Sequence, residues 1–547
     1  MSRPKAHEPY AFDEPAKSEI KTNPMNSPVQ NVFDGGSAER LLASMPSRLT
    51  GLVERQANAN PHRRALISGS KTITYAELWQ AIGRAKDILK DAGVVPGDRV
   101  MIVNENSIAA VTFVFAATAL DAWASPINAR MSAREIDACR AFSGCRTVVY
   151  TIGDSSSAAD HATRVQASTH DDPVFGKVAL APTDENARPE PVYPEKERQT
   201  AILLFSSGTT GAPKGVRLSH QAIMYMGGNM AELRKITPDD MFYNIAPLSH
   251  VIGLGAMLTT AIWAGGTTEL VPQFRPDNFV AALHANRISY VMGVPTIFAR
   301  VIEYAEANGL SLRSDRLRFI AVGGMPLDLT LKAQIESAFG LEIGNSYGMT
   351  EISPITRSPG ATVGRTVGVP QPGIKIRIMR EDGHSAAIGE PGEIWVKGPN
   401  LMLGYYKNDT ANEDVSRPDG FITTGDIGSM DHEGNLSLVG RTKDVIIRSG
   451  FNVYPIEVEA VLSQVPGVAL VAVVGRAVDG NEEVIAYVQP TAGRQLEIAK
   501  LEAWAKENLT AYKRPAKIIL TNELPIGPTG KILKSKLKAD LAADDKQ

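Results

Sequence analysis

The sequence predicts an α/β fold, in which a large N-terminal domain of layered α/β subdomains with a small β-barrel-like part precedes a small α+β C-terminal domain. Apolar strand patterns alternate with helical patterns between residues 72 and 345, as they do around a largely parallel sheet. After about residue 360, apolar and polar residues alternate as in antiparallel strands. The 547 residues are enough for several domains at roughly 100–200 residues each.

The predicted elements follow one another in a regular order. A helix pattern covers 48–58, a strand end and a helix cover 72–93, and a short buried strand covers 99–103. Further strands are predicted at 146–150, 201–206, 241–245, 267–271, 290–293, 317–322, 341–345, 374–379, 392–398, 436–439, 468–474 and 483–489. Further helices are predicted at 221–233, 277–286, 295–307, 328–339, 455–464 and 498–509. Residues 153–198 are polar and Pro-rich without periodicity, which indicates a surface insertion.

Composition excludes several classes of protein. A net charge of −3 gives no electrostatic reason to expect a nucleic-acid partner. Cys139 and Cys145 lack a CxxC spacing, so free thiols are expected and a metal site is not. The apolar runs 109–120 and 251–266 are shorter than the roughly 18–20 residues that span a bilayer, which predicts buried helices, no transmembrane segment and a soluble cytoplasmic protein.

The expected domain boundaries follow from these changes in texture. Residues 1–46 are polar and have no apolar h-region, so they are interpreted as a mobile N-terminal tail, or in part as an arm on the globule, and not as a secretory signal. Residues 47–440 form the expected N-terminal domain, and residues 441–547 form the C-terminal domain.

The strongest local motif follows the predicted strand at 201–206. It comprises Ser206, Ser207, Gly208, Thr209, Thr210, Gly211, Ala212, Pro213, Lys214 and Gly215. Glycines let backbone N–H groups approach a phosphate closely, the hydroxyls donate hydrogen bonds, and Lys214 adds positive charge. The loop is not a Walker A motif, because Pro213 precedes the lysine and no Gly-Lys-Ser/Thr occurs.

A second motif, Ser346-Tyr347-Gly348-Met349-Thr350-Glu351, follows the predicted strand at 341–345. An aromatic face suits a purine, a hydroxyl suits a phosphate, and a carboxylate beside ATP suits Mg²⁺. Together the two motifs resemble the signatures of the adenylate-forming superfamily, in particular its acyl-CoA synthetase branch. The resemblance extends over about residues 48–535, since the other motifs of the family occur in the family's order.

The resemblance implies how ATP and Mg²⁺ are bound. It implies that Tyr347 flanks adenine, with Gly323 and Gly324 beside it, and that Thr350 meets the α-phosphate. Glu351 would hold Mg²⁺. The other nucleotide-contacting positions that it implies are Ser206, Ser207, Gly208, Thr209, Thr210, Gly211, Lys214, Gly348, Met349, Asp426 and Arg441, the last two on the ribose.

Three further positions concern domain motion and catalysis. The resemblance implies that the C-terminal domain is mobile, with a hinge at Lys443. It also implies a catalytic lysine at Lys531 that reaches the α-phosphate during adenylation, and Gly450 lining the tunnel for the pantetheine of CoA. A cation at the position of Lys531 would stabilise the charge of the transition state.

The acid-binding pocket is expected around His250, which the resemblance places at the acyl pocket as a gate to the thiol tunnel. The other expected pocket residues are Val251, Gly253, Gly324, Ser346 and Gly348. Residues 247–256 contain no acidic residue to pair with an α-ammonium, which disfavours an amino acid, and no arginine, which disfavours malonate. A fatty acid and an aryl acid both remain open.

The predicted function is therefore an AMP-forming acid–thiol ligase using ATP, Mg²⁺ and CoA. The carboxylate attacks the α-phosphate, pyrophosphate leaves, and a thiol then displaces AMP. Two alternatives remain: an adenylating enzyme that loads a carrier protein, and a non-catalytic nucleotide-binding homologue. The expected partners are the small-molecule carboxylic acid, ATP and CoA, with no nucleic acid; a homodimer is possible.

Overall fold

Two large mixed sheets form the body of the chain in the computed structural model, which describes residues 35–206, 214–325, 327, 329–358, 366–449, 451–478, 481–491, 493–526 and 532–544. The first sheet has the order β19-β9-β8-β4-β3-β5-β7-β6, with parallel pairing among β8, β4, β3 and β5. Its strands are β3 (Arg99–Asn104), β4 (Trp123–Asn128), β5 (Thr147–Tyr150), β6 (Ser168–Asp172), β7 (Gly176–Leu180), β8 (Thr200–Ser206), β9 (Lys214–Ser219) and β19 (Gly404–Tyr405).

The second sheet has the order β14-β13-β12-β10-β11-β1-β2, and all its pairs are parallel except β1 with β2. Its strands are β1 (Arg64–Ser68), β2 (Lys71–Thr74), β10 (Met241–Asn244), β11 (Thr267–Leu270), β12 (Tyr290–Gly293), β13 (Phe319–Val322) and β14 (Gly344–Asn345). The alternating pattern therefore predicted the largely parallel pairing and the strands β3, β5, β8, β10, β11, β12, β13 and β14 correctly, whereas β1, β4, β6, β7, β9 and β19 were not predicted.

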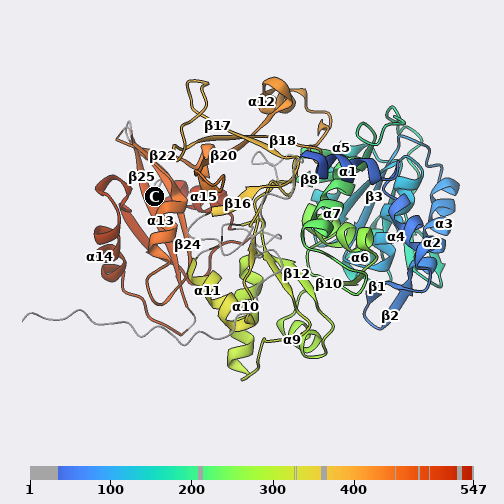
Figure 1. Cartoon of the computed structure of the whole chain (residues 1–547), viewed down its shortest axis with the longest axis horizontal. Coiled ribbons are helices and arrows are strands. Elements are labelled where there is room, and N and C mark those ends of the chain that lie inside the picture. Colours follow the sequence, from blue (N-terminus) through green and yellow to red (C-terminus); the bar gives the residue numbers. More distant parts are fainter. Residues whose placement is uncertain are drawn as a thin grey trace, which may run out of the picture.

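Helices connect and cover these sheets (Figure 1). They are α1 (Gly35–Ser44), α2 (Gly51–Ala59), α3 (Tyr75–Asp91), α4 (Ile108–Ala119), α5 (Ala133–Ser143), α6 (Ser156–Arg164), α7 (His220–Leu233), α8 (Thr260–Ala264), α9 (Pro276–His284), α10 (Pro295–Ala307) and α11 (Leu329–Phe339). Both apolar runs are buried helices, as predicted. Helix α4 is apolar on all sides, as a helix enclosed by other elements must be. The second run forms the π-helix η2 (Ile252–Thr259), which continues into α8.

A third, antiparallel sheet follows, as the alternating pattern predicted. Its order is β15-β16-β21-β20-β18-β17. The strands are β15 (Thr356–Arg357), β16 (Thr366–Pro370), β17 (Lys375–Met379), β18 (Gly392–Lys397), β20 (Ile422–Met430) and β21 (Leu436–Arg441), with helix α12 (Asp409–Val415) before β20. The predicted turn at 431–435 joins β20 to β21 and is closed by a hydrogen bond from Asp431 N to Asn435 O.

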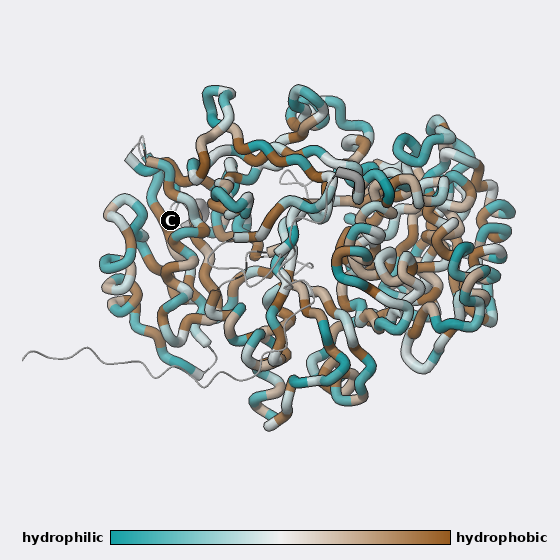
Figure 2. The backbone as a smooth tube through the Cα atoms, viewed as in Figure 1, coloured by the Kyte–Doolittle hydropathy of each residue, from teal (hydrophilic) through white to brown (hydrophobic). Residues whose placement is uncertain are grey.

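The last part of the chain has its own two cores. Alternate residues of β24 point to opposite sides, so that Val473 packs with α13 and α14 whereas Val474 packs with α15. The elements are β22 (Ile446–Arg448), β23 (Phe451–Val453), α13 (Pro455–Leu462), β24 (Val468–Val478), β25 (Asn481–Pro490), α14 (Ile498–Asn508), β26 (Lys517–Leu520) and α15 (Lys534–Asp544). They lie together at one end of the molecule (Figure 1), and Figure 2 shows hydrophobic stretches in their strands.

Two expectations about irregular segments were correct only in part. Residues 35–46 form an arm on the globule: α1 packs on α7, and Leu41 is buried where Gly228 leaves room for its side chain. Residues 1–34 of that predicted tail lie outside the described residues. The segment 153–198 is not a structureless insertion, because it contains α6 and the hairpin β6–β7, whose strand β7 pairs with β5.

Cys139 and Cys145 are free and buried, as expected. None of the helices that the structure describes combines the length and the apolarity needed to cross a bilayer.

Candidate active site

The predicted phosphate loop connects two antiparallel strands. Ser206, the last residue of β8, pairs with Lys214, the first residue of β9. The two residues therefore stand opposite each other where the loop begins and ends. Ser207, Gly208, Thr209, Thr210 and Gly211, which were predicted to bind phosphate, lie outside the described residues.

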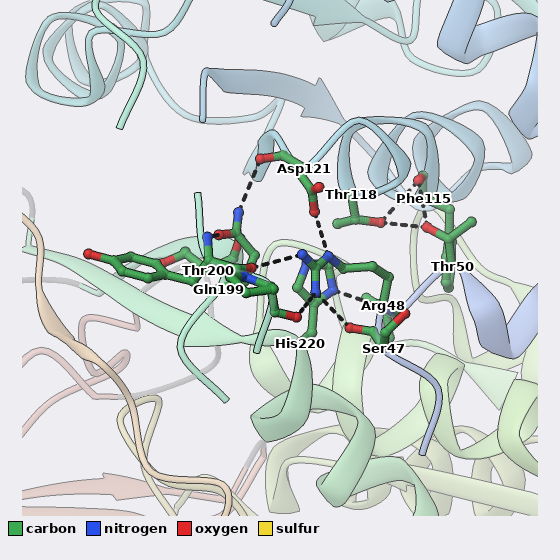
Figure 3. A network of polar contacts seen from close by, with 12 residues as sticks. Ser47, Arg48, Thr50, Phe115, Thr118, Asp121, Gln199, Thr200 and His220 are labelled. Atoms are coloured by element: carbon green, nitrogen blue, oxygen red, sulfur yellow. Dashed lines mark hydrogen bonds and ion pairs between the residues drawn. The ribbon is translucent and has the colours of Figure 1, made fainter. Parts of the chain in front are cut away.

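A buried polar network holds the base of this hairpin (Figure 3). Gln199 and His220 flank the two strands, and the backbone N–H of His220 donates to the backbone carbonyl of Gln199 over 3.1 Å. The backbone N–H of Leu49 donates to His220 Nδ1 over 2.9 Å, and Arg48 pairs with Asp121. Burial, with a smaller effect of the Arg48 charge, lowers the pKa of His220 to about 3, so the ring is neutral. Arg48 and Leu49 thereby fix the end of the β8–β9 hairpin that lies opposite the predicted phosphate loop.

Tyr405 contacts both Lys214 and Glu351. The Tyr405 hydroxyl donates to Glu351 Oε1 over 2.7 Å, and Lys214 Nζ lies 5.3 Å from the centre of the Tyr405 ring. Burial and then the Glu351 charge raise the pKa of Tyr405, so its hydroxyl stays protonated and donates. Glu351 is 8% exposed. The structure therefore brings the end of the phosphate loop close to the predicted Mg²⁺ ligand.

Tyr347 belongs to a second chain of contacts. Its hydroxyl donates to Asp426 Oδ2 over 2.6 Å, and Arg441 Nε donates to Asp426 Oδ1 over 2.7 Å. Asp426 and Arg441 are opposite each other in the β20–β21 pair, so the sheet register itself positions them. Burial, reinforced by the Asp426 charge, raises the pKa of Tyr347 well above its ordinary value. These three predicted nucleotide-binding residues therefore meet.

Two predicted nucleotide-binding residues, Gly323 and Gly324, and the predicted pocket residue Ser346 lie at the carboxyl edge of the second sheet. Gly323 and Gly324 follow β13, and Ser346 follows the neighbouring parallel strand β14. A Cβ on Gly323 would lie 3.7 Å from Ser346 Oγ, so the two segments are in contact. Gly324 has φ +78°, a conformation that favours glycine. In open α/β sheets this edge is where ligands bind.

The segment from Gly348 to Glu351 continues from this edge as a tight turn. The N–H of Met349 donates to Ile352 O, and the N–H of Ile352 donates to Met349 O. Thr350 stands in the turn between Met349 and Glu351. The turn therefore presents Thr350 next to the carboxylate that Tyr405 holds.

His250 lies at the same edge, after β10. Its Nδ1 accepts a hydrogen bond from the Ile252 N–H over 3.2 Å, which ties the ring to the first turn of η2. Val251 is buried, and Gly253 fits so closely that a Cβ there would lie 2.2 Å from the Pro247 carbonyl oxygen. A Cβ on Gly324 would lie 3.6 Å from Ile252 Cδ1 and 3.8 Å from Val294 Cγ1, and both of these residues are apolar.

Sequence reasoning missed two residues that organise the site. Asn106 Nδ2 donates to the carbonyls of Asn244, Ala246 and Val271, and its Oδ1 accepts from the Leu248 N–H, so it fixes the segment that leads to His250. Polar residues directly after a buried strand could have indicated it. Tyr405 is the other missed residue, and the aromatic pair after Gly404 was its only signal in the sequence.

Lys443 stands in the short 3-10 turn Thr442–Asp444 directly after β21. Partial burial and the nearby charge of Arg441 lower the pKa of Lys443, and Lys214 is among the charges that affect it. The next part of the chain contacts β21 through the Tyr454 ring, which lies against Gly440. Gly450 and Lys531 lie outside the described residues.

Known proteins share this arrangement along most of the chain. A family model described as AMP-binding enzyme matches residues 53–406, and one described as AMP-binding enzyme C-terminal domain matches residues 457–531. The chain is 32% identical to a feruloyl-CoA synthase from Amycolatopsis sp., over 88% of this chain and 97% of that protein. It is 31% identical to an indoleacetate–CoA ligase from Aromatoleum aromaticum, over 90% and 97%.

A solved structure agrees with the sequence matches. O-succinylbenzoate coenzyme A synthetase from Bacillus subtilis, in complex with ATP and magnesium ion, superposes with a TM-score of 0.76 at 30% identity and covers 89% of this chain and 99% of its own. The chain thus belongs to the AMP-binding enzymes of the adenylate-forming superfamily, in the acyl-CoA synthetase branch.

Proposed function

We propose that this AMP-forming acid–CoA ligase activates a carboxylic acid with an apolar aryl or alkyl body. The acid is first joined to AMP with release of pyrophosphate, and CoA then displaces AMP to give the thioester. The proposal is supported by the contact of Asp426 with both Tyr347 and Arg441, together with the contacts of Tyr405 with Lys214 and Glu351.

Each part of the nucleotide has a group suited to it. Asp426 and Arg441 would bind the ribose hydroxyls, because an ionised carboxylate forms strong hydrogen bonds with a diol. Tyr347 and the Gly323–Gly324 backbone would enclose adenine. Lys214, Thr350 and Lys531 would neutralise the α-phosphate as the acid attacks it, together with the hydroxyls of Thr209 and Thr210.

The residues also fit a magnesium ion. Glu351 offers a buried carboxylate whose Oε1 accepts the Tyr405 hydroxyl, and Mg²⁺ commonly takes one or two protein carboxylates with phosphate oxygens. Glu351 would hold the ion, which would supply charge neutralisation at the phosphates when bound.

The acid pocket is proposed between His250 and Gly324. Ile252 and Val294 line the approach to Gly324, and neither offers a charge to a second carboxylate or to an ammonium group. The two CoA ligases described above act on feruloyl and indoleacetate groups, which supports the aryl alternative. Activation of a fatty acid instead would indicate that the pocket accepts an alkyl chain.

After adenylation, residues 441–547 are proposed to rotate about Lys443. This motion would withdraw Lys531 and bring the segment around Gly450 to the thiol tunnel. A homodimer and a cytoplasmic location stay predictions, which sedimentation of the purified protein and fractionation of cells would test.

The test is pyrophosphate release from MgATP with panels of aryl, fatty and amino acids, each with and without CoA. The proposal expects CoA-dependent AMP formation with one aryl or fatty class, and a loss of roughly a hundredfold in Lys531→Ala. Release that ignores CoA would instead support a carrier-loading enzyme. No release with any acid, and no effect of Lys531→Ala, would support a nucleotide-binding protein without catalysis.

A further inference from the structure

Tyr405 lies between two groups that the proposed function uses but is not itself assigned a role there. Its position follows from strand pairing. In the β19–β9 pair Tyr405 is opposite Val216, so it is the diagonal neighbour of Lys214 on the same face. Tyr405 is 7% exposed and has Lys214 Nζ over the face of its ring, at a distance where a cation is attracted to the aromatic ring.

The backbone of Tyr405 is held on both sides by one side chain. Asn412, on helix α12, accepts from the Tyr405 N–H over 2.6 Å and donates to the Tyr405 carbonyl over 2.9 Å. Gly404 has φ +117°, and a Cβ there would lie 2.9 Å from Asn412 Oδ1. The tyrosine therefore cannot slide along β9 without breaking these contacts, and its hydroxyl has a defined place.

The Tyr405 hydroxyl donates to the Glu351 carboxylate over 2.7 Å, although the two residues are 54 positions apart in the sequence. An ionised carboxylate has about four acceptor positions, and a single phenol bond leaves the others for a cation. Partners that hold a metal-binding side chain from behind fix its direction, and their loss commonly weakens metal binding about 10–100-fold.

We propose that Tyr405 is a positioning residue: its hydroxyl orients Glu351 toward magnesium, and its ring holds Lys214 beside the same triphosphate. This inference rests on the proposed function, because it assumes that Glu351 and Lys214 receive MgATP. It adds Tyr405 as the residue that aligns the β8–β9 hairpin with the Tyr347–Glu351 motif.

The neighbouring residue provides a matched control. The Tyr406 hydroxyl donates to Glu190 Oε1 over 2.6 Å, and Lys407 Nζ lies 4.8 Å from the centre of the Tyr406 ring. Tyr406 is buried to a similar degree, at 4% exposed. Tyr406→Phe therefore removes the same kind of hydrogen bond one residue away, from a glutamate that belongs to neither motif.

The experiment measures the binding of ATP by calorimetry, with magnesium and with EDTA, for the wild type, Tyr405→Phe and Tyr406→Phe. We expect Tyr405→Phe to weaken MgATP binding roughly tenfold and to raise the magnesium concentration for half-maximal pyrophosphate release. Binding of metal-free ATP should stay within about twofold, since the ring above Lys214 is retained. Tyr406→Phe should leave all three quantities unchanged.

A second pair of variants tests the route of the effect. In the Glu351→Gln background, Tyr405→Phe should have no further effect on MgATP binding, because the side chain through which it acts has lost its charge. Tyr405→Leu, which also removes the ring, should weaken binding of metal-free ATP as well, and its thermal melting beside that of Tyr406→Leu shows whether it is folded.

Three results would overturn the inference: equal effects of Tyr405→Phe and Tyr406→Phe, equal losses of MgATP and metal-free ATP binding in Tyr405→Phe, or an undiminished effect in Glu351→Gln. If the wild type itself does not bind MgATP, the proposed function fails instead, so the two failures are distinguishable.

Discussion

His220 should make the stability of the chain depend on pH, and asparagine at this position should remove that dependence. The side chain is fully buried at the base of the phosphate hairpin, and its Nδ1 accepts the Leu49 N–H. Burial lowers the pKa of His220 to about 3, whereas an unfolded histidine titrates near about 6.5. Asparagine can still accept the Leu49 hydrogen bond through Oδ1 but does not titrate.

The sign follows from which state binds the proton. Between about pH 6.5 and pH 3 the unfolded chain binds a proton at His220 and the folded chain does not. The stabilising contribution of the neutral ring is therefore fully present above pH 6.5 and is lost progressively as the pH falls. One pKa unit corresponds to about 1.4 kcal/mol, so lowering the pH from 7 to 5 should remove about 2 kcal/mol through this residue.

Urea denaturation at pH 7 and pH 5, followed by tryptophan fluorescence, measures the effect. The free energy of unfolding should fall by about 2 kcal/mol less in His220→Asn than in the wild type. His284→Asn, a change at an exposed histidine, is the control and should show the full fall of the wild type. Equal losses in the wild type and His220→Asn would refute the reasoning, since the buried ring would then not be the group that titrates.

Other predictions test the nucleotide contacts and the packing beside the acid pocket. Asp426→Asn should raise the KM for ATP roughly tenfold or more with less effect on kcat, because the proposed charged acceptor for the ribose is lost. Pyrophosphate assays measure both constants. Asp431→Asn, in the β20–β21 turn, is the control and should leave both constants unchanged. Gly253→Ala should destabilise the protein by at least about 1–3 kcal/mol in urea, because the Cβ would meet the Pro247 carbonyl, a backbone atom that cannot turn away. Gly83→Ala, in the open on helix α3, should instead stabilise it by about 0.5–1 kcal/mol, and a fall in its denaturation midpoint would contradict the assignment of free space there.

Local patterns were sufficient to predict most of the elements. Adjacent residues alone indicate the structure of the apolar strand before Ser206, the turn at 431–435 and the mostly apolar helix α4. Each of these segments has its own apolar pattern or its own turn residues. The segment 153–198 was misinterpreted because β6 is polar and both β6 and β7 are short, and β7 becomes a strand through pairing with β5.

The site was predictable where family motifs were contiguous. Tyr347, Asp426 and Arg441 were named from such motifs, and the structure places them in contact. The contact between Tyr405 and Glu351 was not predictable, because it depends on β19 joining the edge of the first sheet beside β9. Long-range pairing of this kind leaves no periodic trace in either segment.

The amide of Asn106 has a consequence for how the enzyme chooses its acid. One side chain joins the ends of β10 and β11 to the segment before His250 through four backbone contacts. A segment held by four hydrogen bonds is ordered before any substrate arrives, so binding an acid in the proposed pocket should cost little conformational entropy on this side. Selection should then follow the shape of the acid more than any closure of the pocket around it, and acids that are too wide should be rejected in the first binding step.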